Sequence, residues 1–237
     1  STAFNQMLGR VEGALLARES SEAKLRRFVA DASHELRNPL AAIRGYAELG
    51  QRSPEGTPHA LGRIGAESER MTKLVNDLLM LARLDADAQV ELRPVDAVEV
   101  VLNAVSDAQA VSRDHRWVLD LPEHGVEVLA DADQLHQVMV NLLSNARTHT
   151  PPGTTVTTAL SALPGAPFGG HAAGVGVAVI HVIDDGPGIP PEALPRVFER
   201  FVRADDARAH SAAQSTGLGL AIVRAVVEGF GGTASVE

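Results

Sequence analysis

The chain lacks cysteine altogether, which excludes disulfides, thiolate metal sites and a cysteine nucleophile. Aromatic residues are also scarce, at 3% of the 237 residues, so the core has to be built from aliphatic side chains and alanine. Hydrophobic residues make up 45% of the chain, which is enough to bury such a core. No apolar run reaches the roughly 18 residues that a membrane span requires, so this chain is not expected to cross a membrane.

Positive charge is in deficit, because 21 Lys and Arg residues stand against 30 Asp and Glu residues and give a net charge of −9. No basic stripe with interleaved aromatic residues appears either, so the sequence argues against a nucleic-acid partner. The chain begins inside a helical pattern and stops inside a strand-like run. We therefore expect a fragment of a longer protein.

The part of the chain up to about Leu84 has the pattern of two helices joined by a turn. The first helix is predicted to run to about Gln51, and the turn-rich segment Ser53–Pro58 separates it from the second. Since a hairpin of two apolar-striped helices cannot cover both stripes, we predict that two hairpins pair into a dimeric four-helix bundle. The stripes repeat every three or four residues, at Leu25, Val29, Ala32, Leu36, Leu40, Ile43 and Ala47, and at Leu61, Ile64, Ser68, Met71, Val75, Leu78 and Ala82.

One histidine of the first helix, His34, points roughly 200° away from this stripe and so into solvent. Its neighbours Glu35 and Asn38 are polar, and Pro39 cannot donate a hydrogen bond to the carbonyl of Glu35. The helix should therefore bend or loosen just after the histidine. An exposed imidazole among polar groups indicates a chemical site, although an ordinary solvated histidine remains the alternative for this segment alone.

Beyond Arg93 the pattern changes to strands that alternate with helices, which predicts an α/β sandwich with helices on one face of a sheet. Asp131 is a suitable N-cap for one of the helices. Ser161–Gly174, rich in Gly, Ala and Pro, is predicted to be a mobile loop. The expected strands are Trp117–Leu121, Val126–Leu129, Thr154–Leu160 and Val175–Ile183, and the expected helices lie within Pro94–Ala110, Ala132–Thr148 and Leu218–Gly229.

Three polar residues of the helix after Asp131 recur every four positions: Asn141, Asn145 and His149. Two stacked carboxamides present neutral oxygens on one helix face, and such oxygens suit Mg²⁺ when phosphates supply the negative charge. An ordinary polar face remains the alternative for this stripe taken alone.

Two pairs of glycines stand at places where backbone can approach a ligand. Asp184 ends a hydrophobic strand and is followed by Gly186 and Gly188, so that a carboxylate and exposed backbone meet there. Gly217 and Gly219 open the last helix, where free amides favour phosphate. A plain turn would explain either pair alone, and the sequence contains neither a P-loop nor a Rossmann fingerprint.

The order of these motifs resembles the cytoplasmic core of the sensor histidine kinases of two-component systems. Residues 28–40 resemble the H-box of that family and 141–146 its N-box. Residues 184–188 and 216–221 are similar to its two glycine boxes, with an F-box at 197–201 between them. The resemblance implies a dimeric helical hairpin followed by an α/β sandwich ATP-binding domain of the histidine kinase, gyrase and chaperone type.

The resemblance also implies a division into three parts. Residues 1–20 would be the end of a HAMP-like linker helix, since Ala3–Leu8 is similar to such a linker. Residues 21–86 would be the dimerisation and phosphotransfer hairpin. Residues 87–237 would be the ATP-binding domain, with an incomplete C-terminus.

For the hairpin, the resemblance implies that His34 is phosphorylated by ATP, that Glu35 holds and activates its imidazole, and that Asn38 orients a water for dephosphorylation of the partner. For the ATP-binding domain, it implies a flexible lid from about Arg203 to Ser215. In the same domain Asn141 and Asn145 would coordinate Mg²⁺, Asp184 would accept a hydrogen bond from the adenine amino group, and His149 would stack on adenine. Gly186 and Gly188 would let the nucleotide approach the protein backbone, and Gly217 and Gly219 would flank the phosphates.

The expected function is that of an ATP-dependent protein-histidine kinase in the cytoplasmic portion of a bacterial inner-membrane receptor. Its expected partners are a second copy of the chain and a response-regulator receiver domain, with the membrane reached only through segments that this chain lacks. An enzyme acting mainly as a phosphatase on the regulator, or a nucleotide-binding scaffold without turnover, are the alternatives. A gyrase-like or chaperone-like ATPase would leave the hairpin and His34 unexplained.

Overall fold

The computed structural model describes residues 28–52, 56–85, 91–163, 177–202 and 216–237. The chain divides into two compact units, residues 1–74 and 75–237. The HAMP-like segment, the predicted lid and residues 164–174 of the predicted loop lie outside the described residues.

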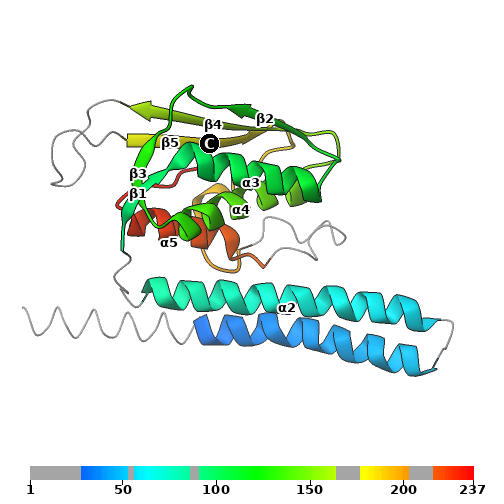
Figure 1. The fold of residues 1–237 in the computed structure, drawn as a ribbon. Coiled ribbons are helices and arrows are strands. Elements are labelled where there is room, and N and C mark those ends of the chain that lie inside the picture. Colours follow the sequence, from blue (N-terminus) through cyan, green and yellow to red (C-terminus); the bar gives the residue numbers. More distant parts are fainter. Residues whose placement is uncertain (1–27, 53–55, 86–90, 164–176, 203–215) are drawn as a thin grey trace, which may run out of the picture. The chain divides into compact units, whose positions relative to one another are not determined.

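The first unit contains a helical hairpin, as predicted. A helix over residues 28–52 is followed by α2 (Thr57–Asp85), and in Figure 1 the first helix and the early part of α2 lie side by side. The Thr57 hydroxyl donates to the Gly50 carbonyl at 3.1 Å and ties the two ends of the turn together. Pro39 is fully buried and the helix continues through it, so the proline does not interrupt the helix.

The inner face of α2 differs from the predicted stripe by one residue. Ala60 and Leu74 are buried, whereas Leu61 is 62% exposed and Val75 is also exposed. Ala60 and Leu74 belong to one row of residues along the helix, and Leu61 and Val75 belong to the neighbouring row. A spacing of three and four residues fits both rows, because Ile64 and Met71 lie between them and are half-buried. The sequence pattern could not tell which row faces the first helix, and the other row is left on the surface of the single chain.

The second unit is an α/β sandwich, which confirms the predicted class. Strand β1 (Arg93–Asp96) pairs antiparallel with β3 (Glu127–Ala130). Strand β4 (Thr155–Leu163) lies between β2 (Arg116–Asp120), which is parallel to it, and β5 (Val177–Asp184), which is antiparallel. Figure 1 shows the three helices α3 (Ala97–Val111), α4 (Ala132–His149) and α5 (Gly219–Gly229) on one side of this sheet.

Side-chain caps fix where two of these helices begin. Asp131 accepts from the Gln134 amide at 2.9 Å and so caps α4, as the sequence predicts. Asp96 caps α3 in the same way, because its Oδ1 accepts from the Val98 amide at 2.9 Å. Between the helices and the sheet the core is aliphatic, and its fully buried members include Val101, Val105, Met139, Leu143 and Val156.

Candidate functional site

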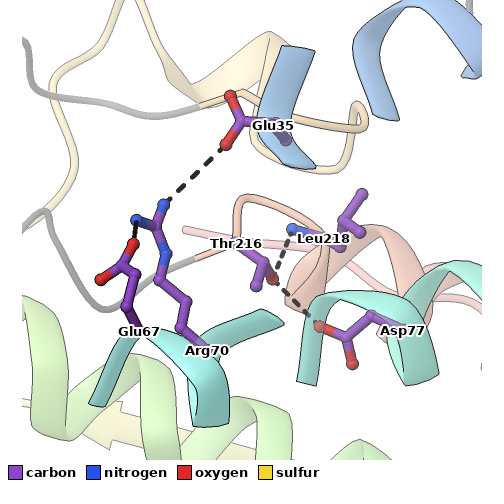
Figure 2. A network of polar contacts seen from close by, with 6 residues as sticks. All are labelled: Glu35, Glu67, Arg70, Asp77, Thr216 and Leu218. Carbon is purple, nitrogen blue, oxygen red and sulfur yellow. Dashed lines mark hydrogen bonds and ion pairs between the residues drawn. The ribbon is translucent and has the colours of Figure 1, made fainter. Parts of the chain in front are cut away.

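His34 is exposed on the first hairpin helix, in agreement with its predicted direction. The next residue, Glu35, is half-buried and lies with its Oε2 3.9 Å from Nη2 of Arg70 on α2. Arg70 also donates to Glu67 at 3.1 Å, so one guanidinium faces two carboxylates, as Figure 2 shows. Asn38, one turn further along, is exposed. The imidazole therefore stands in solvent beside a carboxylate whose position Arg70 influences.

The polar stripe of α4 goes from the interior to the surface along the helix. Asn141 is buried at 3% exposure, Asn145 is half-buried and His149 is exposed. Asn141 lies beside the start of α5, because a Cβ atom placed on Gly219 would be 3.8 Å from its Cβ, Cγ and Oδ1 atoms. The structure therefore brings the predicted asparagine motif and the second glycine motif together.

The turn after β5 packs closely against the end of α4. The Gly186 amide donates to Oδ1 of Asp184 at 3.0 Å. A Cβ atom on Gly186 would lie only 2.6 Å from Cγ2 of Thr150, the C-cap of α4, and 2.7 Å from Oδ1 of Asp184. Glycine is thus required here by close approach, and the Asp184 carboxylate is held at the surface near the end of the asparagine helix.

The neighbouring acid, Asp185, has a different role. Its Oδ1 accepts from the Thr155 amide at 2.7 Å, and its own amide donates to the Thr155 carbonyl. Asp185 therefore holds the beginning of β4, while the Asp184 carboxylate is exposed and accepts from the nearby Gly186 amide.

The entrance to α5 is held by a buried polar contact that the sequence did not reveal. The hydroxyl of Thr216 donates to Oδ2 of Asp77, in the second unit's part of α2, at 3.0 Å and accepts from the Leu218 amide at 3.4 Å (Figure 2). Both Asp77 and Thr216 are buried. Since α5 has no side-chain cap, the amides of its first turn keep the anion-binding character of a helix start.

Gly217 stands where any side chain would be strained. Its φ is +67°, and a Cβ atom there would lie 3.0 Å from the Cα of Phe201, whose amide donates to the Gly217 carbonyl at 2.8 Å. We expect Gly217→Ala to destabilise the second unit by about 1–3 kcal/mol, because the left-handed backbone and the close contact add. Denaturant unfolding measures this change.

Gly229→Ala is the matched control, because Gly229 lies in α5 with no positive φ and no atom within 4 Å of an added Cβ. It should leave the free energy of unfolding unchanged or raise it by about 0.4–1 kcal/mol. Equal effects of the two substitutions would contradict the steric argument.

The asparagines of α4 offer neutral amide oxygens that a metal could use. Among the residues that the structure describes, no group of three His, Asp or Glu side chains is placed to hold an ion. Amide oxygens together with nucleotide phosphates are a donor set that suits Mg²⁺. Within the same described ranges, no helix combines the length and apolar character of a membrane span.

The stripe of α4 and both glycine motifs were predicted from the sequence. Three residues that contact predicted site residues were not: Gln137, which donates to Asn141 at 3.2 Å, Arg70 and Thr150. Gln137 stands four residues before Asn141, so the same spacing argument extended by one turn would have included it. Arg70 and Thr150 act through contacts between elements, which only the fold reveals.

Comparison with known proteins separates the same two regions. A family model of the His Kinase A (phospho-acceptor) domain matches residues 24–87. A second model, of the histidine kinase-, DNA gyrase B- and HSP90-like ATPases, matches residues 130–237. The second match identifies the α/β sandwich as an ATP-binding domain.

Curated relatives match along the whole chain, and two of them illustrate the range of identity. The probable sensor histidine kinase TcrY of Mycobacterium tuberculosis is 53% identical over 239 residues, which is 100% of this chain and 48% of that protein. The signal transduction histidine-protein kinase/phosphatase MprB of Mycolicibacterium smegmatis is 36% identical over 244 residues, covering 99% of this chain and 45% of that protein. The chain thus spans about half the length of these relatives.

Among solved structures, full-length ShkA in complex with AMPPNP is 27% identical, with a TM-score of 0.59 over 87% of this chain and 41% of that one. The resemblance that the five sequence motifs indicated is confirmed by these matches. With a phospho-acceptor segment, an ATPase domain after it and relatives of this identity over its whole length, the chain belongs to the sensor histidine kinase family.

Proposed function

We propose that this chain is the catalytic core of an ATP-dependent protein-histidine kinase that phosphorylates its own His34 and passes the phosphoryl group to an aspartate of a response regulator. The observation that carries the proposal is the exposed His34 beside Glu35, on a hairpin that matches the phospho-acceptor family and precedes an ATPase domain. The two curated relatives, named as histidine kinases, support the same reaction.

The nucleotide would lie along α4, between the Asp184 turn and the start of α5. Asp184 would accept from the adenine amino group, and Gly186 and Gly188 would let the base approach the backbone. At the other end, the α5 amides beside Gly217 and Gly219 would receive the phosphates. The AMPPNP complex of ShkA supports nucleotide binding by this fold.

Two further residues of α4 complete this proposal. Asn145 would hold Mg²⁺ through its amide oxygen, and His149, exposed at the end of α4, would stack on adenine. When bound, Mg²⁺ neutralises phosphate charge on the transferring group. The sequence predicts Asn141 as a metal ligand as well, but its Oδ1 already accepts from Gln137, which favours a different contact for this amide.

In the transfer step, a ring nitrogen of His34 attacks the γ-phosphorus of ATP, a nitrogen–phosphorus bond forms, and ADP leaves with the bridging oxygen. Glu35 would take the proton from the imidazole, and Arg70 would keep its carboxylate in position. The phosphoryl group then moves from His34 to a carboxylate oxygen of the regulator.

Incubation of the chain with γ-labelled ATP and Mg²⁺ tests this proposal directly. A phosphohistidine label is lost in acid and survives base, which distinguishes it from phosphoserine, phosphothreonine and phosphoaspartate. A label that survives acid would overturn the proposed chemistry.

We also propose a homodimer through the hairpin. Leu61 is 62% exposed and Leu40 is 58% exposed in the single chain, so an apolar row remains to be covered. Leu61→Glu costs the single hairpin little but would bury a charge in the paired bundle, so it should convert a dimer to a monomer. Leu78, although on the predicted seam, is half-buried within the chain and is a poorer probe.

Sedimentation velocity at micromolar concentration measures the outcome of the Leu61 substitution. Ala66→Glu, on another face of α2 and also exposed, makes the same charge change and should leave the dimer intact. A native chain that sediments as a monomer would contradict the proposed bundle.

A phosphatase activity toward the regulator is the second part of the proposed function, with Asn38 orienting the attacking water. Asn38 is exposed one turn after His34, and the relative MprB is named a kinase/phosphatase. Asn38→Ala should slow dephosphorylation of the regulator about tenfold or more while sparing autophosphorylation. The ratio of the two rates, compared with that of Asn103→Ala on α3, decides the matter, and an unchanged ratio argues against the role.

The division of the chain and its location complete the proposal. Residues 21–86 would form the dimerisation and phosphotransfer hairpin, residues 87–237 the ATP-binding domain, and residues 1–20 the end of a HAMP-like linker. Since the relatives are bacterial and twice as long, we place the chain in the cytoplasmic portion of an inner-membrane receptor.

A further inference from the structure

Gln137 and Asn141 form a hydrogen-bonded amide pair on the face of α4 that continues to Asn145. Nε2 of Gln137 donates to Oδ1 of Asn141 at 3.2 Å, across one turn of the helix. The side-chain oxygen of Asn141, Oδ1, therefore already accepts a hydrogen bond from within the protein.

The other end of the Asn141 amide has no such partner. Its Nδ2 is buried and makes no hydrogen bond with any residue that the structure describes, while the whole side chain is 3% exposed. Buried amide nitrogens are nearly always hydrogen-bonded in proteins, so an unpaired one points to an acceptor that arrives with a ligand.

The surroundings of Asn141 indicate what that acceptor is. The side chain lies beside Gly219 at the start of α5, where a Cβ atom would be 3.8 Å from Asn141. Amides at a helix start attract phosphate, and a carboxamide nitrogen donates to the same kind of oxygen. The Nδ2 atom of Asn141 cannot ligate a metal, because an amide N–H₂ group offers hydrogens and no available lone pair.

We propose that Gln137 is a positioning residue for the nucleotide site, which holds the Asn141 amide so that Nδ2 donates to a phosphate oxygen and leaves metal binding to Asn145. The inference rests on the proposed kinase function and assigns different ligands to the two asparagines. Asn141 binds phosphate with or without Mg²⁺, whereas Asn145 acts through the metal.

The reverse orientation of the pair is the competing arrangement. In it, Nδ2 of Asn141 would donate to the oxygen of Gln137, and Oδ1 would turn to the metal. The two arrangements make opposite predictions for isosteric substitutions, because aspartate and glutamate keep the shape of the side chain but lose the donor.

The experiment measures ADP affinity of the full chain by calorimetry, once in EDTA and once in excess Mg²⁺. Asn141→Asp should weaken ADP binding in EDTA roughly tenfold or more, because a charged acceptor replaces the donor, and Mg²⁺ should not restore it. An Asn141→Asp chain that binds ADP with Mg²⁺ as tightly as the native chain would show that Asn141 is a metal ligand and would overturn the proposal.

Gln137→Glu tests the positioning itself. The glutamate carboxylate can only accept hydrogen bonds, so it should draw Nδ2 of Asn141 toward itself and away from the ligand. The ADP affinity in EDTA should therefore fall roughly tenfold. In the reverse orientation the substitution would preserve the existing bond and leave this affinity at its native value. Gln109→Glu, exposed on α3, makes the same charge change and should have no effect.

A spectroscopic measurement on the native chain keeps the test valid if a variant of the buried Asn141 does not fold. The side-chain amide resonances of Asn141 should shift on addition of ADP in EDTA, and resonances that stay unmoved at saturation would overturn the proposal. A native chain that binds no ADP in either buffer would instead remove the kinase function on which the inference rests.

Discussion

Replacement of His34 by glutamine should abolish acid-labile labelling by γ-labelled ATP while nucleotide binding stays at its native level. The imidazole supplies the attacking nitrogen in the proposed reaction, and glutamine keeps the polarity and approximate size of the side chain but has no nucleophilic nitrogen. His34 is exposed on its helix, so its loss removes little packing. The expected result is therefore loss of one chemical step without loss of fold.

His59→Gln provides the matched control for this substitution. His59 is also exposed, lies on the other helix of the hairpin and makes an edge contact with the ring of Tyr46. It should label at the native rate. An acid-labile label of native strength in the His34→Gln chain would remove His34 from the mechanism, whereas loss of labelling in both variants would indicate damage to the hairpin.

Regular spacing made most of the fold predictable from the sequence. The stripe of α4, the cap at Asp131 and the β-branched runs of β4 and β5 each follow from local rules, and the structure contains all three elements. Strand β1 was missed, because its four residues include Pro94 and half of them are exposed, so they carry no periodic signal.

The buried row of α2 could not be deduced for a different reason. Two rows of residues, one through Ala60 and Leu74 and one through Leu61 and Val75, satisfy the same spacing. Which row faces inward depends on the first helix, and a pattern within one helix does not contain that information. The same holds for Arg70, whose relation to Glu35 is a contact between helices.

The candidate site shows the same division between local and long-range information. Its residue types and order were readable, since Asn141, Asn145 and the glycines stand at spacings that local geometry explains. The choice of Asp184 over the adjacent Asp185 came from the family resemblance and not from local spacing, which treats the two acids alike. Only the pairing of β4 with β5 shows that Asp185 is engaged by Thr155 and that Asp184 is not.

This difference between two adjacent carboxylates gives the second large prediction. Asp184→Asn should lower ATP affinity roughly 10- to 100-fold and reduce the preference for ATP over inosine triphosphate. The asparagine oxygen can still accept from the Gly186 amide, so the turn is kept, but an N–H₂ group then faces the ligand. That donor opposes the amino group of adenine and suits the carbonyl that hypoxanthine carries in its place.

Asp185→Ala is the control that separates binding from folding. It removes the acceptor of the Thr155 amide at 2.7 Å, so it should lower the free energy of unfolding by about 0.5–1.5 kcal/mol without changing the choice between the two nucleotides. Competition binding with ATP and inosine triphosphate, together with denaturant unfolding, measures both variants. If Asp184→Asn keeps the native preference for ATP, or if Asp185→Ala changes that preference instead, Asp184 is not the residue that recognises adenine.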